Sequence, residues 1–169
     1  EQSGVFLTSL IARENEHPWI YTRGITGALD HLQMSFDELL LLTKEAAHYL
    51  DSHTVKSKEV LDRTLADIIE DNLPKKKLTL CRGPSSYGKP DQQTVGGAAV
   101  SFLLRPCSFY SLVVFGKRLD NSPTFTSFKK WVDRAPAHIP DAENELVRKF
   151  LHCYGPTTRS NFTNWLGSS

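Results

Sequence analysis

Two amphipathic patterns follow each other between Ser35 and Asp71, and they constrain the fold more than any other feature. Ser35 followed by Glu38 fits a capping box, which predicts a helix from Phe36 to Asp51. A break at residues 52–54 comes next, and a second helix is predicted over Ser57–Asp71, with Ser57 as its cap and apolar residues at helical spacing. Because the connection is so short, the two helices should pack against each other.

The segment after this helix pair reads differently. Residues 72–90 hold Pro74, Gly83-Pro84, Ser85-Ser86 and Pro90. This composition is typical of an exposed loop. We predict a short strand within it, Leu78 to Cys81. A third helix is expected from Gln92 to Leu104, ended by Pro106, although its Gly96-Gly97 pair lowers helix stability by about 1 kcal/mol per glycine relative to alanine.

A strand–loop–strand pattern follows the third helix. Residues 110–115 (YSLVVF) are rich in β-branched and aromatic side chains, and residues 124–128 (TFTSF) alternate in character. The eight residues between them form a loop that carries Lys117 and Arg118. The sequence therefore predicts a hairpin over Tyr110–Phe128 with a long basic tip, closed by Lys129, Lys130 and Trp131.

A last pair of helices is expected near the end of the sequence. Asp141 is placed as an N-cap, with acidic residues in the first turn, and Leu146, Val147, Phe150 and Leu151 form an expected buried stripe. Residues 154–156 (YGP) should stop this helix. Thr157 or Thr158 then caps a short helix that runs through Trp165, whose side chain continues an apolar stripe.

Helix, turn, helix, loop, helix and a hairpin with a basic tip is the element order of a winged helix. We therefore predict an α+β fold, mainly helical, with one complete winged-helix module at residues 36–134 and a basic insertion in it at residues 72–91. Residues 1–35 are expected to be the tail of a preceding domain, with one short helix and with Gly24 and Gly27 breaking up its second half. Residues 135–140 are a linker, and residues 141–169 are the first two helices of a second, incomplete winged helix.

Positive charge is concentrated in the middle of the chain. The chain as a whole has a net charge of +1, but residues 72–134 hold eleven lysines and arginines against three aspartates, which gives +8 for this segment and −7 for the rest. Such a segment attracts phosphate if its charges converge in space. The alternative is that clustering along the sequence does not become a patch on the surface.

A winged helix places its third helix near the major groove and its hairpin tip along the phosphate backbone. Lysine and arginine reach backbone oxygens without reading sequence, whereas glutamine can bond adenine at its base edge. Three alternatives stay open: a solvated hairpin turn, a third helix that belongs to the core, and a solvated loop around the lysine run. The candidate DNA-binding residues are Lys75, Lys76, Lys77, Arg82, Lys89, Gln92, Gln93, Thr94, Lys117, Arg118, Lys129 and Lys130.

The last third of the chain carries a resemblance to a known family. Tyr154-Gly155-Pro156-Thr157-Thr158, Asn161-Phe162 and Trp165-Leu166-Gly167 resemble the YGPAT-x-x-DF-x-x-W-x-G stretch of a bacterial winged-helix family that includes the AlkZ-type DNA glycosylases. Residues 145–151 are similar to the helix before that stretch, and residues 54–61 look like the second helix of the family's upstream module. Asn161 departs from the family's aspartate.

The resemblance implies tandem winged-helix modules that grip duplex DNA and, in catalytic members, hydrolysis of N-glycosidic bonds at alkylated or cross-linked purines. The family's glutamine-containing catalytic motif lies ahead of the region covered here. No catalytic residue is therefore assigned, and we expect this chain alone to release no base. Two alternatives are a winged-helix transcription regulator and a winged helix used for protein–protein assembly.

Other site classes have little support in the sequence. The six histidines show no metal-binding spacing, and Cys81, Cys107 and Cys153 form no CxxC pair, so we expect no metal, no cofactor and reduced thiols in a cytoplasmic protein. There is no phosphate-binding glycine loop and no nucleophile elbow. No apolar run approaches the ~20 residues of a membrane span.

Overall fold

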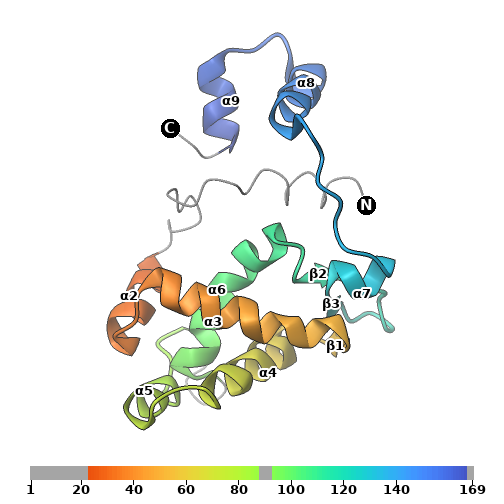
Figure 1. Ribbon diagram of the computed structural model, residues 1–169. Helices are drawn as coiled ribbons and strands as arrows, with labels where there is room; N and C mark the ends of the chain where they lie inside the picture. The colour runs from red at the N-terminus through yellow and green to blue at the C-terminus, as the bar shows by residue number, and fades with distance from the viewer. Residues whose placement is uncertain (1–22, 88–92, 167–169) are drawn as a thin grey trace.

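The computed structural model describes residues 23–87 and 93–166, and in these segments the fold is mainly helical with a small antiparallel sheet (Figure 1). This confirms the α+β, mainly helical class. The helices are α2 (Arg23–Leu32), α3 (Phe36–Ala47), the 3₁₀ turn η1 (His48–Asp51), α4 (Lys58–Glu70), α5 (Lys75–Cys81), α6 (Val95–Phe109), α7 (Phe128–Val132), α8 (Ala142–Tyr154) and α9 (Arg159–Leu166). The strands are β1 (Val55–Lys56), β2 (Val114–Phe115) and β3 (Thr124–Thr126).

The first helix pair forms as the sequence predicts. The Ser35 side chain accepts a hydrogen bond from the Glu38 backbone at 3.1 Å, and α3 continues through η1 to Asp51. Ser57 caps α4 in the same way, by accepting from the backbone of Val60. These caps satisfy backbone donors that have no partner inside a helix, which is why the two starts can be recognised from the sequence.

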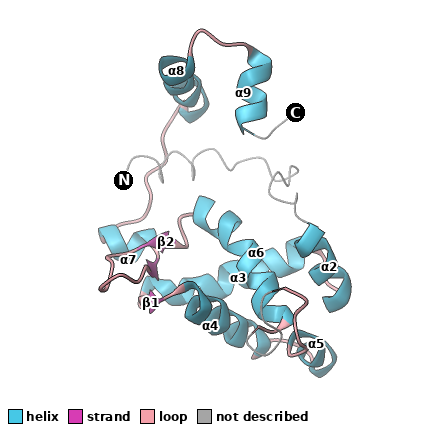
Figure 2. Cartoon of the chain, turned by 180° about the vertical axis from the view of Figure 1, so that it is seen from behind, coloured by secondary structure: helices cyan, strands magenta, loops and turns pink. Residues whose placement is uncertain are grey.

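Two groups of buried apolar side chains form the core, and α6 contributes to both. One group joins α3, α4 and the sheet, with Leu50, Leu61 and Leu65 fully buried. The other joins α2, α3, α5 and α6, with Leu32 and Leu103 at its centre. Helix α6 crosses α3 in the middle of the body and contacts α2, α3 and α4 (Figure 2). Residues 23–32 are therefore packed together with the segment that follows residue 35.

The third helix differs from the prediction at both ends. It runs from Val95 to Phe109 rather than from Gln92 to Leu104, and Pro106 lies inside it instead of ending it. Proline in a helix removes a hydrogen bond and crowds the preceding turn. Here Pro106 and its neighbours Leu103 and Cys107 are fully buried, so tertiary packing stabilises the last turn.

Helices α2 and α5 differ from the sequence prediction, and glycines lie where each of them packs against α6. The predicted strand Leu78–Cys81 is wrong: these residues belong to α5, and a Cβ on Gly96 would lie 3.3 Å from the Cβ of Cys81. The expected break at Gly24 and Gly27 is also wrong, since both lie within α2. A Cβ on Gly24 would lie 2.4 Å from the Phe102 ring, so a larger residue there would displace this ring at the contact between α2 and α6.

The strands are shorter than predicted, and one was not foreseen. The sheet order is β1-β3-β2, with Val114 opposite Thr126, Phe115 opposite Phe125, and Val55 of β1 also opposite Phe125. Residues 110–113 precede β2 because α6 continues to Phe109 and the chain then turns with a positive φ of 60° at Ser111. Residue 128 is not in β3, because Ser127 caps α7 by accepting from the backbone of Lys130.

Helices α8 and α9 lie apart from the α2–α7 body in both views and face each other (Figures 1 and 2). The Phe150 ring contacts the rings of Phe162 and Trp165 at centroid distances of 5.0 and 5.1 Å. Phe150 is buried and Leu146 half-buried, but Leu151 is 48% exposed and Val147 is exposed as well. The predicted burial of Val147 and Leu151 is therefore wrong for this chain, and Trp165 on α9 is 50% exposed.

The core positions of two cysteines lead to a prediction about thiol reactivity. Burial raises the pKa of Cys81 to about 11 and that of Cys107 to about 12, so neither forms the reactive thiolate near neutral pH. Cys153 is exposed on α8. A chromogenic disulfide reagent should therefore label one thiol quickly in the folded chain and three in denaturant. Equal labelling rates for all three thiols in the folded chain would contradict this core.

Asp62 of α4 is a buried carboxylate at the contact between α4 and α6. Its Oδ2 lies 2.8 Å from Lys58 Nζ, and Lys58 also donates to Ser101 of α6. Its Oδ1 has no hydrogen-bond partner among the residues that the structure describes. Burial raises the pKa of Asp62, and the contacts with Lys58 offset this only in part.

The raised pKa fixes the sign of a pH effect on stability. The folded chain holds the Asp62 proton more tightly than the unfolded chain, in which the pKa of an aspartate is about 4. The contribution of Asp62 to stability therefore falls as the pH rises above about 4. We expect the free energy of unfolding of the wild type, relative to Asp62→Asn, to decrease between pH 4 and pH 7 in urea titrations. A difference that stays flat or increases over this range would show that burial does not dominate.

Candidate nucleic-acid interface

The β2–β3 hairpin carries the basic tip that the sequence predicts. Residues 116–123 connect the strands, and their outer turn is closed by paired backbone hydrogen bonds between Leu119 and Ser122 at 3.0 and 3.2 Å. Gly116 at the base of the loop has no room for a side chain, since a Cβ would lie 2.7 Å from Thr124 Oγ1. That hydroxyl donates to the Lys117 carbonyl at 2.7 Å, which fixes the loop on β3.

Lys117 and Arg118 point into solvent from this loop. Both are exposed, and within the described part of the chain neither side chain forms an ion pair or a hydrogen bond. A shallow hollow beside them is lined by Phe115, Gly116, Arg118 and Pro123. Two uncompensated cations on a loop with a fixed base have the geometry needed to approach a polyanion.

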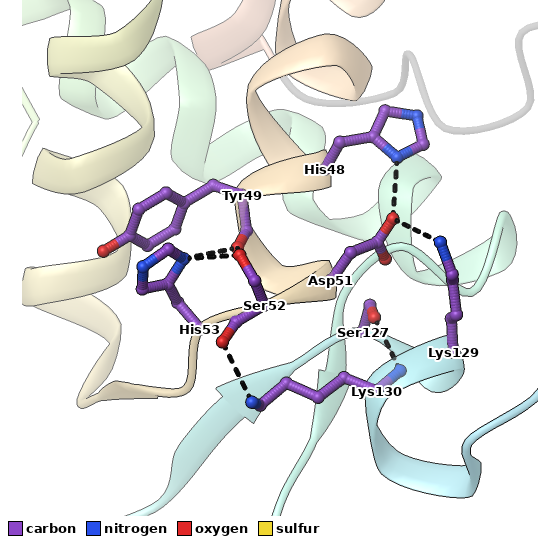
Figure 3. A network of polar contacts seen from close by, with 8 residues as sticks. All are labelled: His48, Tyr49, Asp51, Ser52, His53, Ser127, Lys129 and Lys130. Carbon is purple, nitrogen blue, oxygen red and sulfur yellow. Dashed lines mark hydrogen bonds and ion pairs between the residues drawn. The ribbon is translucent and has the colours of Figure 1, made fainter.

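Helix α7 adds two lysines next to the hairpin, but both are engaged by the η1 segment (Figure 3). The Lys129 ammonium lies 3.7 Å from Asp51 Oδ2, and Lys130 Nζ donates to the Ser52 carbonyl at 3.0 Å. Lys129 is still 65% exposed, so it can contact a second anion while it faces Asp51. The hairpin loop, α7 and η1 together form what we call the hairpin end.

Asp51 is the acidic centre of the hairpin end. Burial raises the pKa of Asp51, but hydrogen bonds from Ser127 and His48 and the charge of Lys129 outweigh this effect, and the pKa lies below its usual range. His48 Nδ1 lies 3.2 Å from Asp51 Oδ2. His53 stacks on Tyr49 with a centroid distance of 3.8 Å (Figure 3). Asp51 therefore stays ionised at neutral pH and holds η1 and α7 together.

The lysine run does not join the hairpin end. Lys75, Lys76 and Lys77 lie on α5, which is at the opposite end of the α2–α7 body from the sheet in both views (Figures 1 and 2). Lys77 pairs with Glu38 at 2.6 Å, and Arg82 pairs with Glu70 at 2.8 Å. The basic residues of the middle segment are thus divided between two ends of the molecule instead of forming one patch.

The start of the third helix gives little support for base reading. Thr94 is its N-cap and accepts from the Gly97 backbone at 3.1 Å, while Gln93 precedes the helix and is partly buried. Lys89 and Gln92 lie outside the described residues. Nine of the fifteen residues of α6 are buried, and Arg105 is its one exposed residue. This burial favours the core-helix alternative over a helix that reads base edges.

Comparisons of the chain with protein-family models, with curated proteins and with solved structures give no significant match. The likeness of residues 145–167 to the glycosylase-containing family therefore stays a prediction that comes from the sequence motif.

Two features beside the hairpin end were not predicted from the sequence. Lys56 is exposed on β1, a two-residue strand too short to give a periodic signal of its own. Phe115 was expected to be an ordinary strand residue, but its side chain is 72% exposed. An apolar residue next to Gly116-Lys117-Arg118 is the signal that could have indicated an exposed aromatic ring.

Two other features are absent from residues 23–87 and 93–166. No group of three or more histidine, cysteine, aspartate or glutamate side chains lies together in a way that could hold a metal ion. None of the helices described is both long and apolar enough to cross a membrane.

Proposed function

We propose that this chain binds duplex DNA through the hairpin end of a winged-helix module, by contacts to the phosphate backbone. The observation that carries the proposal is the hairpin loop itself. Lys117 and Arg118 are exposed there without acidic partners. Of the candidates on and just after α5, Lys77 and Arg82 are paired with glutamates, whereas Lys75 and Lys76 are exposed at the far end of the body from the hairpin (Figure 1). Free cations displace counterions from DNA, and this release drives sequence-independent binding.

The arrangement of elements supports a winged helix. Helices α3, α4 and α6 precede a two-stranded hairpin, and β1, between α3 and α4, adds a third strand beside β3. The Ser57 backbone donates to the Pro123 carbonyl at 3.1 Å, which ties the start of α4 to the hairpin loop. Such a tie would hold the loop at a fixed position relative to the helices while it lies along a DNA strand.

The burial of α6 favours a backbone-binding module over a sequence-specific transcription regulator. Direct readout needs several side chains that project from one helix into the major groove. Arg105 is the one exposed side chain on α6, so this helix offers little for direct readout. We therefore keep non-specific or lesion-directed duplex binding as the proposed function and set the regulator aside.

The biological setting that we propose is DNA repair. The YGPTT motif lies at the end of α8 and just after it, and residues 161–166 of the NF-x-x-W-L-G motif lie on α9. Thr158 Oγ1 accepts a hydrogen bond from the Asn161 backbone at 3.2 Å. Asparagine at position 161, where the family has aspartate, is therefore compatible with a capped helix. We infer that the α8–α9 pair begins a second module in a bacterial N-glycosylase-like protein, with the catalytic motif elsewhere.

The salt dependence of duplex binding tests the proposed function. Fluorescence anisotropy with a labelled duplex of random sequence should give a log–log slope of affinity against salt between about −2 and −4, if two to four cations of the hairpin end contact phosphates. Two duplexes of unrelated sequence should bind about equally. If no duplex binds even at low salt, the proposal is wrong and the protein-assembly alternative is favoured.

A further inference from the structure

The hairpin end and strand β2 beside it combine free cations with three exposed apolar side chains. Phe115 is 72% exposed, Trp131 is 52% exposed and Leu119 is 41% exposed. The Trp131 ring lies close to Gly116, since a Cβ there would be 3.8 Å from its Cζ3. These side chains surround the loop that carries Lys117 and Arg118. Phosphate contacts alone give no reason for aromatic rings at this place.

Phe115 is presented to solvent by its position in the sheet. Its ring is inclined by 38° to the ring of Phe125, its partner on β3, at a centroid distance of 5.2 Å, and Phe125 is buried. Phe115 and Arg118 together line the shallow hollow at the base of the loop. The ring therefore packs against Phe125 and is otherwise largely open to solvent, and Arg118 lines the same hollow.

We propose that the hollow of the hairpin end binds one unpaired nucleobase, which stacks on the Phe115 ring while Lys117 and Arg118 contact the adjoining phosphates. Every base has a π-face, so stacking on an aromatic ring is tolerant of sequence. Residues 114–131 carry four lysines and arginines against one acidic residue, Asp120, which suits a polyanion better than an acidic or apolar peptide alone. This inference rests on the proposed function and names the DNA feature that the same site would prefer.

The test compares a fully paired duplex with the same duplex carrying one unpaired 2-aminopurine as a bulge. We expect the wild type to bind the bulged duplex at least about fivefold more tightly than the paired one, because a stacked base adds to the phosphate contacts. The fluorescence of 2-aminopurine should change when it stacks on the ring. Phe115→Leu should lose both the preference and the fluorescence change, while its affinity for the paired duplex stays within about twofold of the wild type.

Two further variants serve as controls for this test. Phe115→Tyr retains a flat ring and should retain the preference, whereas Leu41→Ala removes an exposed leucine of α3 and should change nothing. Paired-duplex binding without a preference for the bulge would overturn this inference and leave the proposed function standing. Absence of binding to either DNA would overturn both, and an unchanged preference in Phe115→Leu would exclude this ring as the stacking surface.

Discussion

Replacing Lys117 and Arg118 together by alanine should weaken duplex binding by roughly 10- to 60-fold at 0.1 M salt and reduce the salt slope by about 2, because two phosphate contacts are removed. Both side chains are exposed and form no contact that holds the fold. The double variant should therefore unfold at the same urea concentration as the wild type. Anisotropy titrations at several salt concentrations measure the affinity and the slope in one series.

A matched control comes from α5. Replacing Lys75 and Lys76 by alanine removes the same charge from exposed positions at the other end of the α2–α7 body (Figure 1). This variant should bind the duplex within about threefold of the wild type, since charges farther away than the Debye length of about 10 Å are largely screened at 0.1 M salt. Equal losses in the two double variants would mean that net charge, and not the hairpin loop, controls binding.

Replacing Leu103 by alanine should lower the free energy of unfolding by about 2–5 kcal/mol, the usual range for a leucine removed from a packed core. Leu103 is fully buried on α6 between α2 and α3. The cost arises from lost apolar burial and from the cavity that remains. Urea unfolding followed by far-UV circular dichroism provides the measurement, with an unchanged m-value as evidence that the denatured state is the same.

Leu41→Ala is the control for this effect because it removes the same side chain from a position that is 57% exposed. Exposed substitutions usually change stability by about 0.5 kcal/mol or less. A small loss for Leu103→Ala, similar to that of Leu41→Ala, would contradict the assignment of α6 to the core. The helix would then again be a candidate for contacts with bases.

The parts of the fold that the sequence predicts correctly are those set by local interactions. The caps at Ser35 and Ser57 each satisfy a backbone donor three residues ahead, and the structure places both helix starts there. The hairpin loop was located from its glycine, its cations and the apolar residues on either side. Such signals act within a few residues and need no knowledge of the rest of the chain.

The errors arise where distant residues decide the local conformation. Gly24 and Gly96 suggest breaks or weak helix when taken alone, but each permits one helix to approach another. Pro106 should end a helix, yet its burial in the core stabilises the turn that contains it. Tertiary packing of this kind overrides local preference, and a single sequence does not reveal which positions it affects.

Only part of the candidate site could be predicted, because the packing of distant elements decides which basic side chains come together. Lys117, Arg118, Lys129 and Lys130 do lie at one end of the molecule, because the hairpin and α7 are adjacent in the chain. The lysines of α5 were grouped with them through sequence proximity alone. Their separation follows from α6, which crosses the body between α5 and the hairpin (Figure 2).

Mapping the DNA contact by nuclear magnetic resonance tests the central claim most directly. The amide signals of the ¹⁵N-labelled chain would be followed while an unlabelled duplex is added. We expect the largest shifts in residues 116–123 and 127–130, smaller shifts near Lys56, and unchanged signals in α5. Shifts that concentrate in α5 or along α8 and α9, with the hairpin loop unaffected, would contradict our assignment of the interface.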